Sequence, residues 1–227
     1  LWNGTSGEVI DETGTFNAQA INGPLPTSQT PAIAGNPGTC RYGSFDGVND
    51  YIALPSSFEN LQDSFTVTAW INASGGGRIF ADDENNTQGY ALSLGDNGTG
   101  RLRFYSRGVS PVSVDTTAAI TPNTWTFVAA VHNSVTKTRE IYINGIAQTV
   151  SGGGTSNTYT GTWGIDSGPA SIGGETDSGE TSSRFTGDID EFQLYKSALN
   201  ASQLQTIMNE THPCSDVSVD HFTVGYN

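Results

Sequence analysis

Short runs of alternating apolar and polar residues, separated by glycine-containing turns, most restrict how this chain can fold. Successive side chains of a β-strand point to opposite faces, so such a run offers one face to a core and one to solvent. Residues 101–107 alternate throughout, and residues 65–71 place Phe65 and Ile71 opposite Trp70. Asn144-Gly145 is a strong signal for a tight hairpin turn. The pattern predicts an all-β protein.

Composition agrees with this prediction. The chain has 28 glycines among 227 residues, and only 14% of its residues are charged, which suits short strands joined by turns better than helices. β-sandwiches of this length are common as single domains. We therefore expect one domain over residues 1–213, and we interpret residues 214–227 as an extension or the start of a following domain.

Residues 185–195 are predicted to form the last strand, and they contain an acid in an unusual position. Strict alternation places Asp188 and Asp190 on the side of Phe192 and Leu194. A carboxylate among core residues is costly unless it is hydrogen-bonded, paired or bound to a metal. Two hypotheses for Asp190 remain open, a buried acid bonded to backbone amides and a metal ligand.

One short helix is expected after this strand. Residues 200–203 form a capping-box sequence, with Asn at the first position and Gln at the fourth. Leu204, Ile207 and Met208 then share one helical face. The chain is thus predicted to end in a strand followed by a helix.

The formal net charge of −14 restricts the partners of the protein. Such a surface repels nucleic acid and anionic membranes, and it offers many oxygen ligands to calcium. No apolar run is long enough to insert into a membrane. We therefore expect neither a nucleic-acid partner nor membrane insertion.

Two cysteines, Cys40 and Cys214, bear on the compartment. Both could be free thiols in a cytosolic protein, but their spacing excludes a CxxC redox motif and a zinc ribbon. Their placement suggests a clamp between an early strand and the segment after the helix, and we favour a disulfide in an extracytoplasmic protein. Asn-x-Ser/Thr sequons fit an exported eukaryotic protein, or arise by chance in a bacterial surface protein, which we prefer.

Four blocks carry a resemblance to a known family: residues 45–51, residues 65–70, residues 123–129 with 142–145, and residues 187–191 through Tyr195 and Leu199. In this order they resemble the laminin G-like jelly roll of the concanavalin A-like lectin/glucanase superfamily. The resemblance implies two antiparallel sheets face to face, one of them concave, often with a calcium ion. Members mostly bind sugars or proteins. Cys214 and residues 219–222 also resemble bacterial surface proteins of the MSHA-type pilus biogenesis group.

The resemblance also implies a calcium site. It joins Asp11 in the first loop, Asp46 in a turn and Asp190 in the last strand, with Asp50 and Asp188 in reserve. No EF-hand sequence is present, so the site would be discontinuous. The acidic run that starts at Asp82 is a second candidate for metal or ligand, and its alternative is a solvated turn.

Catalysis is not expected, although the superfamily contains glucanases with strand motifs of the form E-x-D-x-E. Asp188 and Asp190 share a face here, whereas Glu191 points to the other side and Phe192 takes the last position. A retaining glycosidase needs two carboxyl groups about 5 Å apart across the sugar. This strand does not supply them, and we interpret the protein as non-enzymatic.

Ligand contacts are expected on the strand 101–107. Arg103, Tyr105 and Arg107 point away from Leu102 and Phe104, and could bind an acidic or polyhydroxylated glycan. In the alternative, the arginines pair with acids on neighbouring strands. Trp163 lies between glycines in a loop, either stacking on a sugar or anchoring the loop.

Together these features predict a calcium-stabilised carbohydrate-recognition or adhesion module of a secreted or surface protein. Its partners would be a glycan, a cell-surface or matrix ligand, and other domains of the same polypeptide. The alternatives are a structural spacer in a pilus-associated or adhesin chain and a divergent glycan hydrolase.

Overall fold

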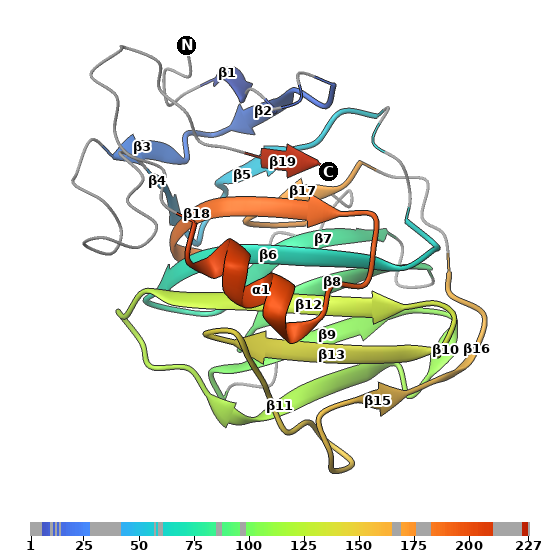
Figure 1. Cartoon of the computed structure of the whole chain (residues 1–227). Coiled ribbons are helices and arrows are strands. Elements are labelled where there is room, and N and C mark those ends of the chain that lie inside the picture. The colour runs from blue at the N-terminus through green and yellow to red at the C-terminus, as the bar shows by residue number, and fades with distance from the viewer. Residues whose placement is uncertain are drawn as a thin grey trace.

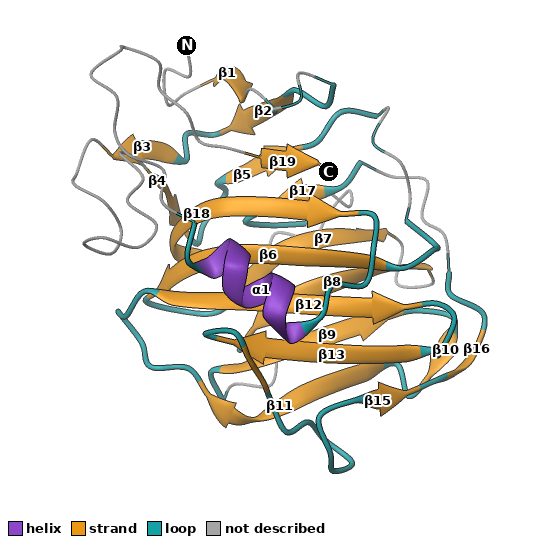
Figure 2. Ribbon diagram, in the orientation of Figure 1, coloured by secondary structure: helices purple, strands orange, loops and turns teal. Residues whose placement is uncertain are grey.

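The computed structural model is a sandwich of two mainly antiparallel sheets with one short helix on its outside (Figures 1 and 2). It describes residues 6–9, 11, 13, 15–27, 42–56, 58, 61–84, 88–95, 99–164, 169–175, 183–210 and 224–226. The all-β jelly-roll prediction with a single C-terminal helix is confirmed.

The helix-side sheet faces the viewer in Figure 1. Its strand order is β14 (Ile146–Ala147), β13 (Thr138–Ile143), β12 (Thr126–Asn133), β6 (Phe65–Ala73), β18 (Thr186–Tyr195), β4 (Tyr42–Asp46) and β3 (Leu25–Thr27). β15 (Asn157–Thr158) pairs with β13, and β19 (Val224–Tyr226) runs parallel to β18. Asn144 and Gly145 join β13 to β14 with φ angles of 50° and 72°, so the predicted hairpin turn is confirmed.

The far sheet lies behind it. Its order is β1 (Ser6–Val9), β2 (Ala18–Ile21), β5 (Tyr51–Ala53), β17 (Ser171–Ile172), β7 (Gly77–Glu84), β8 (Gln88–Leu94), β9 (Arg101–Ser106) and β11 (Ser113–Ala119). A two-stranded ribbon of β10 (Val109–Ser110) and β16 (Thr160–Gly161) joins the loops at one end. β7 extends through Asp82 to Glu84, so the predicted acidic loop begins as strand.

The main core fills the space between the two sheets. Phe65 and Val67 of β6 enter it from the helix-side sheet, and Leu102 and Phe104 of β9 enter it from the far sheet, all at 1% exposure or less. The inward side of residues 101–107 was therefore predicted correctly. The opposite side of β9 belongs to the outer face of the far sheet.

Helix α1 (Ala201–Met208) covers the outer face of the helix-side sheet (Figures 1 and 2). Leu204 and Leu199 pack there against Trp70 and Phe127. The predicted capping box is present, because the Asn200 side chain accepts from the backbone N–H of Gln203 and the Gln203 side chain accepts from that of Asn200. Within the described residues no helix is long and apolar enough to span a membrane.

The predicted facing of Asp190 is wrong, because β18 contains a bulge. Two of its residues, Glu191 and Phe192, oppose the single residue Ala69 of β6. Glu191 adopts a positive φ of 47°. This extra residue puts Ile189, Phe192 and Leu194 together in the core. Asp190 instead pairs with Trp70, whose ring belongs to the cluster under α1.

Several predictions fall outside the described residues. Cys40 and Cys214 lie there, as do residues 219–222. Part of the segment that we interpreted as an extension is described: Val224–Tyr226 pairs with Phe192–Leu194 of β18 and so adds a strand to the helix-side sheet.

Candidate functional site

The outer face of the far sheet, which we call the far face, has a floor of small residues. Strand pairing aligns Ala53, Ser171, Ala81, Ala91, Tyr105 and Ser113 across neighbouring strands from β5 to β11. All but Tyr105 are alanine or serine. Small side chains leave space above the sheet for longer side chains that reach across it.

Tyr105 rises from this floor beneath two arginines. The guanidinium carbons of Arg78 and Arg107 lie 4.7 Å and 5.1 Å from the centre of its ring, and Arg78 Nη2 donates to its hydroxyl over 3.3 Å. Only 5% of Tyr105 is exposed. Tyr105 lies on the predicted face, but as the base of a cation–π cluster and not as an open platform for a sugar.

The arginines of the far face are accompanied by acids. Arg103 Nε and Nη2 donate to the Asp115 carboxylate over 2.6 Å and 3.4 Å, and Arg78 Nε donates to Glu175 over 3.3 Å. The alternative in which an arginine pairs with an acid on the next strand is thus confirmed for Arg103. The far face carries charged groups of both signs, not a purely basic stripe.

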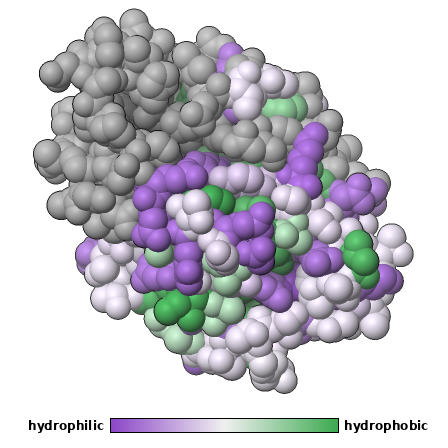
Figure 3. Space-filling view, viewed as in Figure 1, coloured by the Kyte–Doolittle hydropathy of each residue, from purple (hydrophilic) through white to green (hydrophobic). Residues whose placement is uncertain are grey.

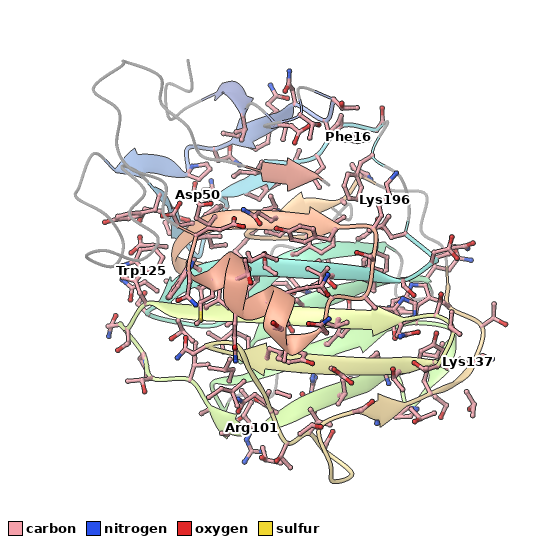
Figure 4. All side chains as sticks on the ribbon, in the orientation of Figure 1. Phe16, Asp50, Arg101, Trp125, Lys137 and Lys196 are labelled. Carbon is pink, nitrogen blue, oxygen red and sulfur yellow. The ribbon has the colours of Figure 1, made fainter. Side chains whose placement is uncertain are left out.

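A second guanidinium–aromatic pair lies on the same face, and sequence reasoning missed it. The guanidinium carbon of Arg184 is 4.2 Å from the centre of the Tyr51 ring. Tyr51 neighbours Ile52, a core residue of β5, and therefore points outward. Arg184 precedes the last strand in an irregular segment, where no periodic pattern could have identified it. In Figure 4, Asp50, next to Tyr51, lies in the upper half of the molecule and Arg101 in the lower half; the far sheet runs from β5 to β9 between them.

Trp163 is not exposed. Its indole is 6% exposed and stacks on His132, with ring centres 3.8 Å apart and an interplanar angle of 18°. It also meets Phe65 edge to face at 6.0 Å. The loop-anchor alternative is therefore confirmed, and an exposed ring for sugar stacking is excluded. Asp82 is likewise only 3% exposed, so its side chain is not presented on a solvated turn.

Two of the predicted metal ligands, Asp11 and Asp46, are hydrogen-bonded to groups a few residues away in sequence. Asp11 is 1% exposed; its Oδ2 accepts from the Thr13 hydroxyl and from the N–H groups of Thr15 and Phe16, while its Oδ1 is buried without a partner. Asp46 is exposed, and its Oδ1 accepts from Val48 N–H over 2.7 Å and Asn49 N–H over 3.3 Å.

The remaining three acids are also bonded. Asp50 Oδ2 accepts from the N–H of Asp46 over 3.1 Å, Asp188 accepts from Asn72 over 3.2 Å, and Asp190 Oδ1 accepts from the N–H of Glu191 over 2.9 Å. Burial raises the pKa of both Asp50 and Asp188 above the usual value for aspartate.

The positions of Asp46 and Asp190 do not fit one shared calcium ion. Asp46 pairs with Thr186, so Asp190 lies four residues further along β18, about 13 Å away at the usual rise of a strand. Calcium–oxygen distances are only about 2.3–2.6 Å. Within the described residues, no group of three His, Cys, Asp or Glu side chains is arranged to hold a metal.

On the helix side of the molecule, the described residues form no broad apolar surface. Figure 3 shows hydrophilic residues around α1 and only small, separate hydrophobic patches on that visible face. The exposed large hydrophobic residues there include Ile146, the first residue of β14, at 64% exposure. The far face, with its charged and aromatic clusters, is the stronger candidate for a binding site.

Solved structures share this fold. Domain 4 of AbnA, an extracellular arabinanase of Geobacillus stearothermophilus, in complex with arabinotriose, is 19% identical and aligns over 89% of this chain and 98% of its own, with a TM-score of 0.60. The CBM40 of a Ruminococcus gnavus IT-sialidase, bound to α2,3-sialyllactose, is 15% identical over 65% of this chain and 83% of its own, with a TM-score of 0.53. Mouse laminin α1 domains LG4–5 are 18% identical over 78% and 47%, also with a TM-score of 0.53.

No curated protein matches the chain. A laminin G-type family profile, described as the concanavalin A-like lectin/glucanases superfamily, matches residues 46–205. This range contains the strands from β5 to β18, which belong to both sheets of the sandwich, and most of α1. The chain belongs to the concanavalin A-like lectin/glucanases superfamily.

Proposed function

We propose that this domain is a carbohydrate-binding module and that it binds glycans through the far face. The observation that carries the proposal is the cluster of Arg78, Arg103, Arg107 and Tyr105 above a floor of alanine and serine. Guanidinium groups donate to sugar hydroxyls and carboxylates, and the neighbouring acids accept from hydroxyls. Such mixed donors and acceptors suit a polyhydroxylated ligand.

Two further points support this choice of face. Helix α1 covers the outer side of the helix-side sheet, so the far face is the broad sheet surface without a helix among the described residues. Two domains of the same fold were solved with the oligosaccharides arabinotriose and sialyllactose. The proposal makes the glycan the partner of this domain and places the domain in a secreted or surface protein with a role in adhesion.

The proposed role is binding without catalysis. Asp188 and Asp190, which superficially echo a glucanase motif, belong to the helix-side sheet and not to the far face. On the far face, Glu175 and Asp115 are each ion-paired with an arginine. Both carboxylates are thus engaged as acceptors of a guanidinium group.

Calcium stabilisation and a disulfide remain part of the proposal. For calcium the argument rests on Asp11, whose buried Oδ1 has no hydrogen-bond partner and could be satisfied by a cation. For the disulfide it rests on the placement of Cys40 and Cys214 in the sequence. Neither is needed for the geometry of the far face.

A glycan array followed by calorimetry tests the function. We expect the wild-type protein to retain one class of glycan, and the variant Arg103→Gln/Arg107→Gln to lose about tenfold or more in affinity, since hydrogen bonds to charged groups contribute roughly 1.5–3 kcal/mol each. Lys137→Gln, which removes a positive charge from the exposed turn between β12 and β13, is the matched control. Unchanged affinity of a folded double variant would reject the far face as the site.

A further inference from the structure

The pair formed by Arg184 and Tyr51 is separate from the Tyr105 cluster. Tyr51 belongs to β5 and Tyr105 to β9, four strand positions away in the far sheet. At the usual spacing between strands this is about 19 Å. Glu175, which pairs with Arg78 of the Tyr105 cluster, also acts electrostatically on Arg184 and so lies between the two.

Gly174 keeps the space that the Arg184 guanidinium occupies. A Cβ atom at this position would fall 2.2 Å from Arg184 Nη1, 2.9 Å from its Cδ and 3.1 Å from the Cβ of Tyr51. The φ of Gly174 does not lie in the left-handed region, so the backbone there does not require glycine. Because Gly174 has no side chain, the Arg184 guanidinium can lie over the Tyr51 ring.

The guanidinium of Arg184 has unused donors. Its Nε and Nη1 atoms are buried and have no hydrogen-bond partner, although the side chain as a whole is partly exposed. Buried donors are nearly always satisfied in native proteins, and an exception calls for an explanation. Oxygen atoms of a ligand would supply the missing acceptors.

The surroundings of Arg184 favour a neutral ligand. Burial lowers the pKa of Arg184, and the carboxylates of Asp50 and Glu175 lie close enough to oppose this shift in part. A carboxylate or sulfate brought to Arg184 would meet these two acids and be repelled. Hydroxyl groups can instead accept from the guanidinium and donate to the neighbouring carboxylates.

We propose that Arg184, placed over Tyr51 by Gly174, forms a second subsite on the far face that binds adjacent hydroxyl groups of a neutral sugar. This inference rests on the proposed glycan-binding function, and it replaces a purely anionic ligand by a neutral one at this subsite. Arg184 would act as a hydrogen-bond donor that orients the sugar, with Tyr51 supporting its guanidinium plane.

The test uses defined oligosaccharides on the whole chain. Arabinotriose, xylotriose and maltotriose serve as neutral probes, and α2,3-sialyllactose as an acidic one. We expect at least one neutral probe to bind, and Arg184→Gln and Gly174→Ala each to weaken it about tenfold or more. Lys137→Gln, which removes a positive charge from the exposed turn between β12 and β13, is the control that should leave the affinity within about twofold.

A spectroscopic measurement on the wild-type protein tests the subsite even if the variants fold poorly. The Nε–H resonance of Arg184, assigned by its loss in Arg184→Lys, should shift when the neutral probe is titrated into the wild-type protein. Binding of a neutral probe with this resonance unmoved and both variants unaffected would overturn the subsite but leave the proposed function standing. Binding of sialyllactose alone would also overturn the subsite and leave the proposed function standing. An array on which no glycan binds would reject both.

Discussion

Protonation of His132 should destabilise this protein in mild acid. The imidazole is fully buried between Trp163 and Tyr159; its Nδ1 lies 3.0 Å from the carbonyl oxygen of Asp63, and its Nε2 lies 2.8 Å from the Tyr159 hydroxyl. Because a carbonyl oxygen only accepts, Nδ1 carries the proton and Nε2 accepts from the hydroxyl. Burial, with a smaller contribution from the Arg139 guanidinium, lowers the pKa of His132 from 6.5 to about 4.

The direction and size of this pH effect on stability follow from the difference in proton binding between the folded and unfolded protein. Between pH 6.5 and 4 the unfolded chain binds a proton at this histidine and the folded protein does not, so stability is complete above pH 6.5 and falls as the pH approaches 4. At 1.36 kcal/mol for each pKa unit, the loss is about 3 kcal/mol. Asp50 and Asp188, whose pKa values are raised by burial, work in the opposite direction as the pH falls.

Urea unfolding of the wild type and of His132→Asn, at steps from pH 7.5 to pH 4, isolates the histidine. Both proteins share the aspartates, so the difference between their pH slopes reports His132 alone. We expect the wild type to lose about 3 kcal/mol more than the variant over this range. Equal slopes, or an NMR titration with the pKa of His132 at or above 6.5, would refute the reasoning.

Three further predictions follow from the packing and from the sequence. Trp163→Ala should lower the unfolding free energy by about 3–5 kcal/mol, because it empties the centre of an aromatic cluster, and denaturant titration measures it; a loss below about 1 kcal/mol would contradict the anchor role. Cys40 and Cys214 should appear as a disulfide by intact-mass analysis of exported protein, and reducing a bond that closes so long a loop should cost roughly 5 kcal/mol; two free thiols would reject it. Chelation should lower the melting temperature and calcium should restore it, with Asp11→Asn blunting the response; identical melting curves with and without chelator would exclude a strippable ion.

Local patterns in the sequence were sufficient for much of the architecture. Leu102 and Phe104 entered the core as their alternation predicted, because the side-chain period of a strand is a property of its backbone. Asn144-Gly145 formed its turn because these residues tolerate positive φ. The capping box around Asn200 formed because its donors and acceptors lie within four residues of one another.

Alternation failed where the backbone departed from regular geometry. Glu191 takes a positive φ that few non-glycine residues adopt, and the resulting bulge reverses the faces of the residues before it relative to those after it. Strict alternation therefore placed Asp190 on the side of Phe192, whereas the structure places it on the side of Trp70. Nothing in the hydrophobic pattern of this strand marks the extra residue.

The sequence by itself determined the class of fold, the faces of most strands and the single helix, because these depend on residues a few positions apart. Tertiary structure alone decided the partners: Trp163 against His132, Arg78 over Tyr105, and Arg184 in the space left by Gly174 above Tyr51. Alternation says that a side chain points outward, but not which residue from another strand will cover it. That choice depends on the order and register of the strands, which pairing across the whole sandwich sets.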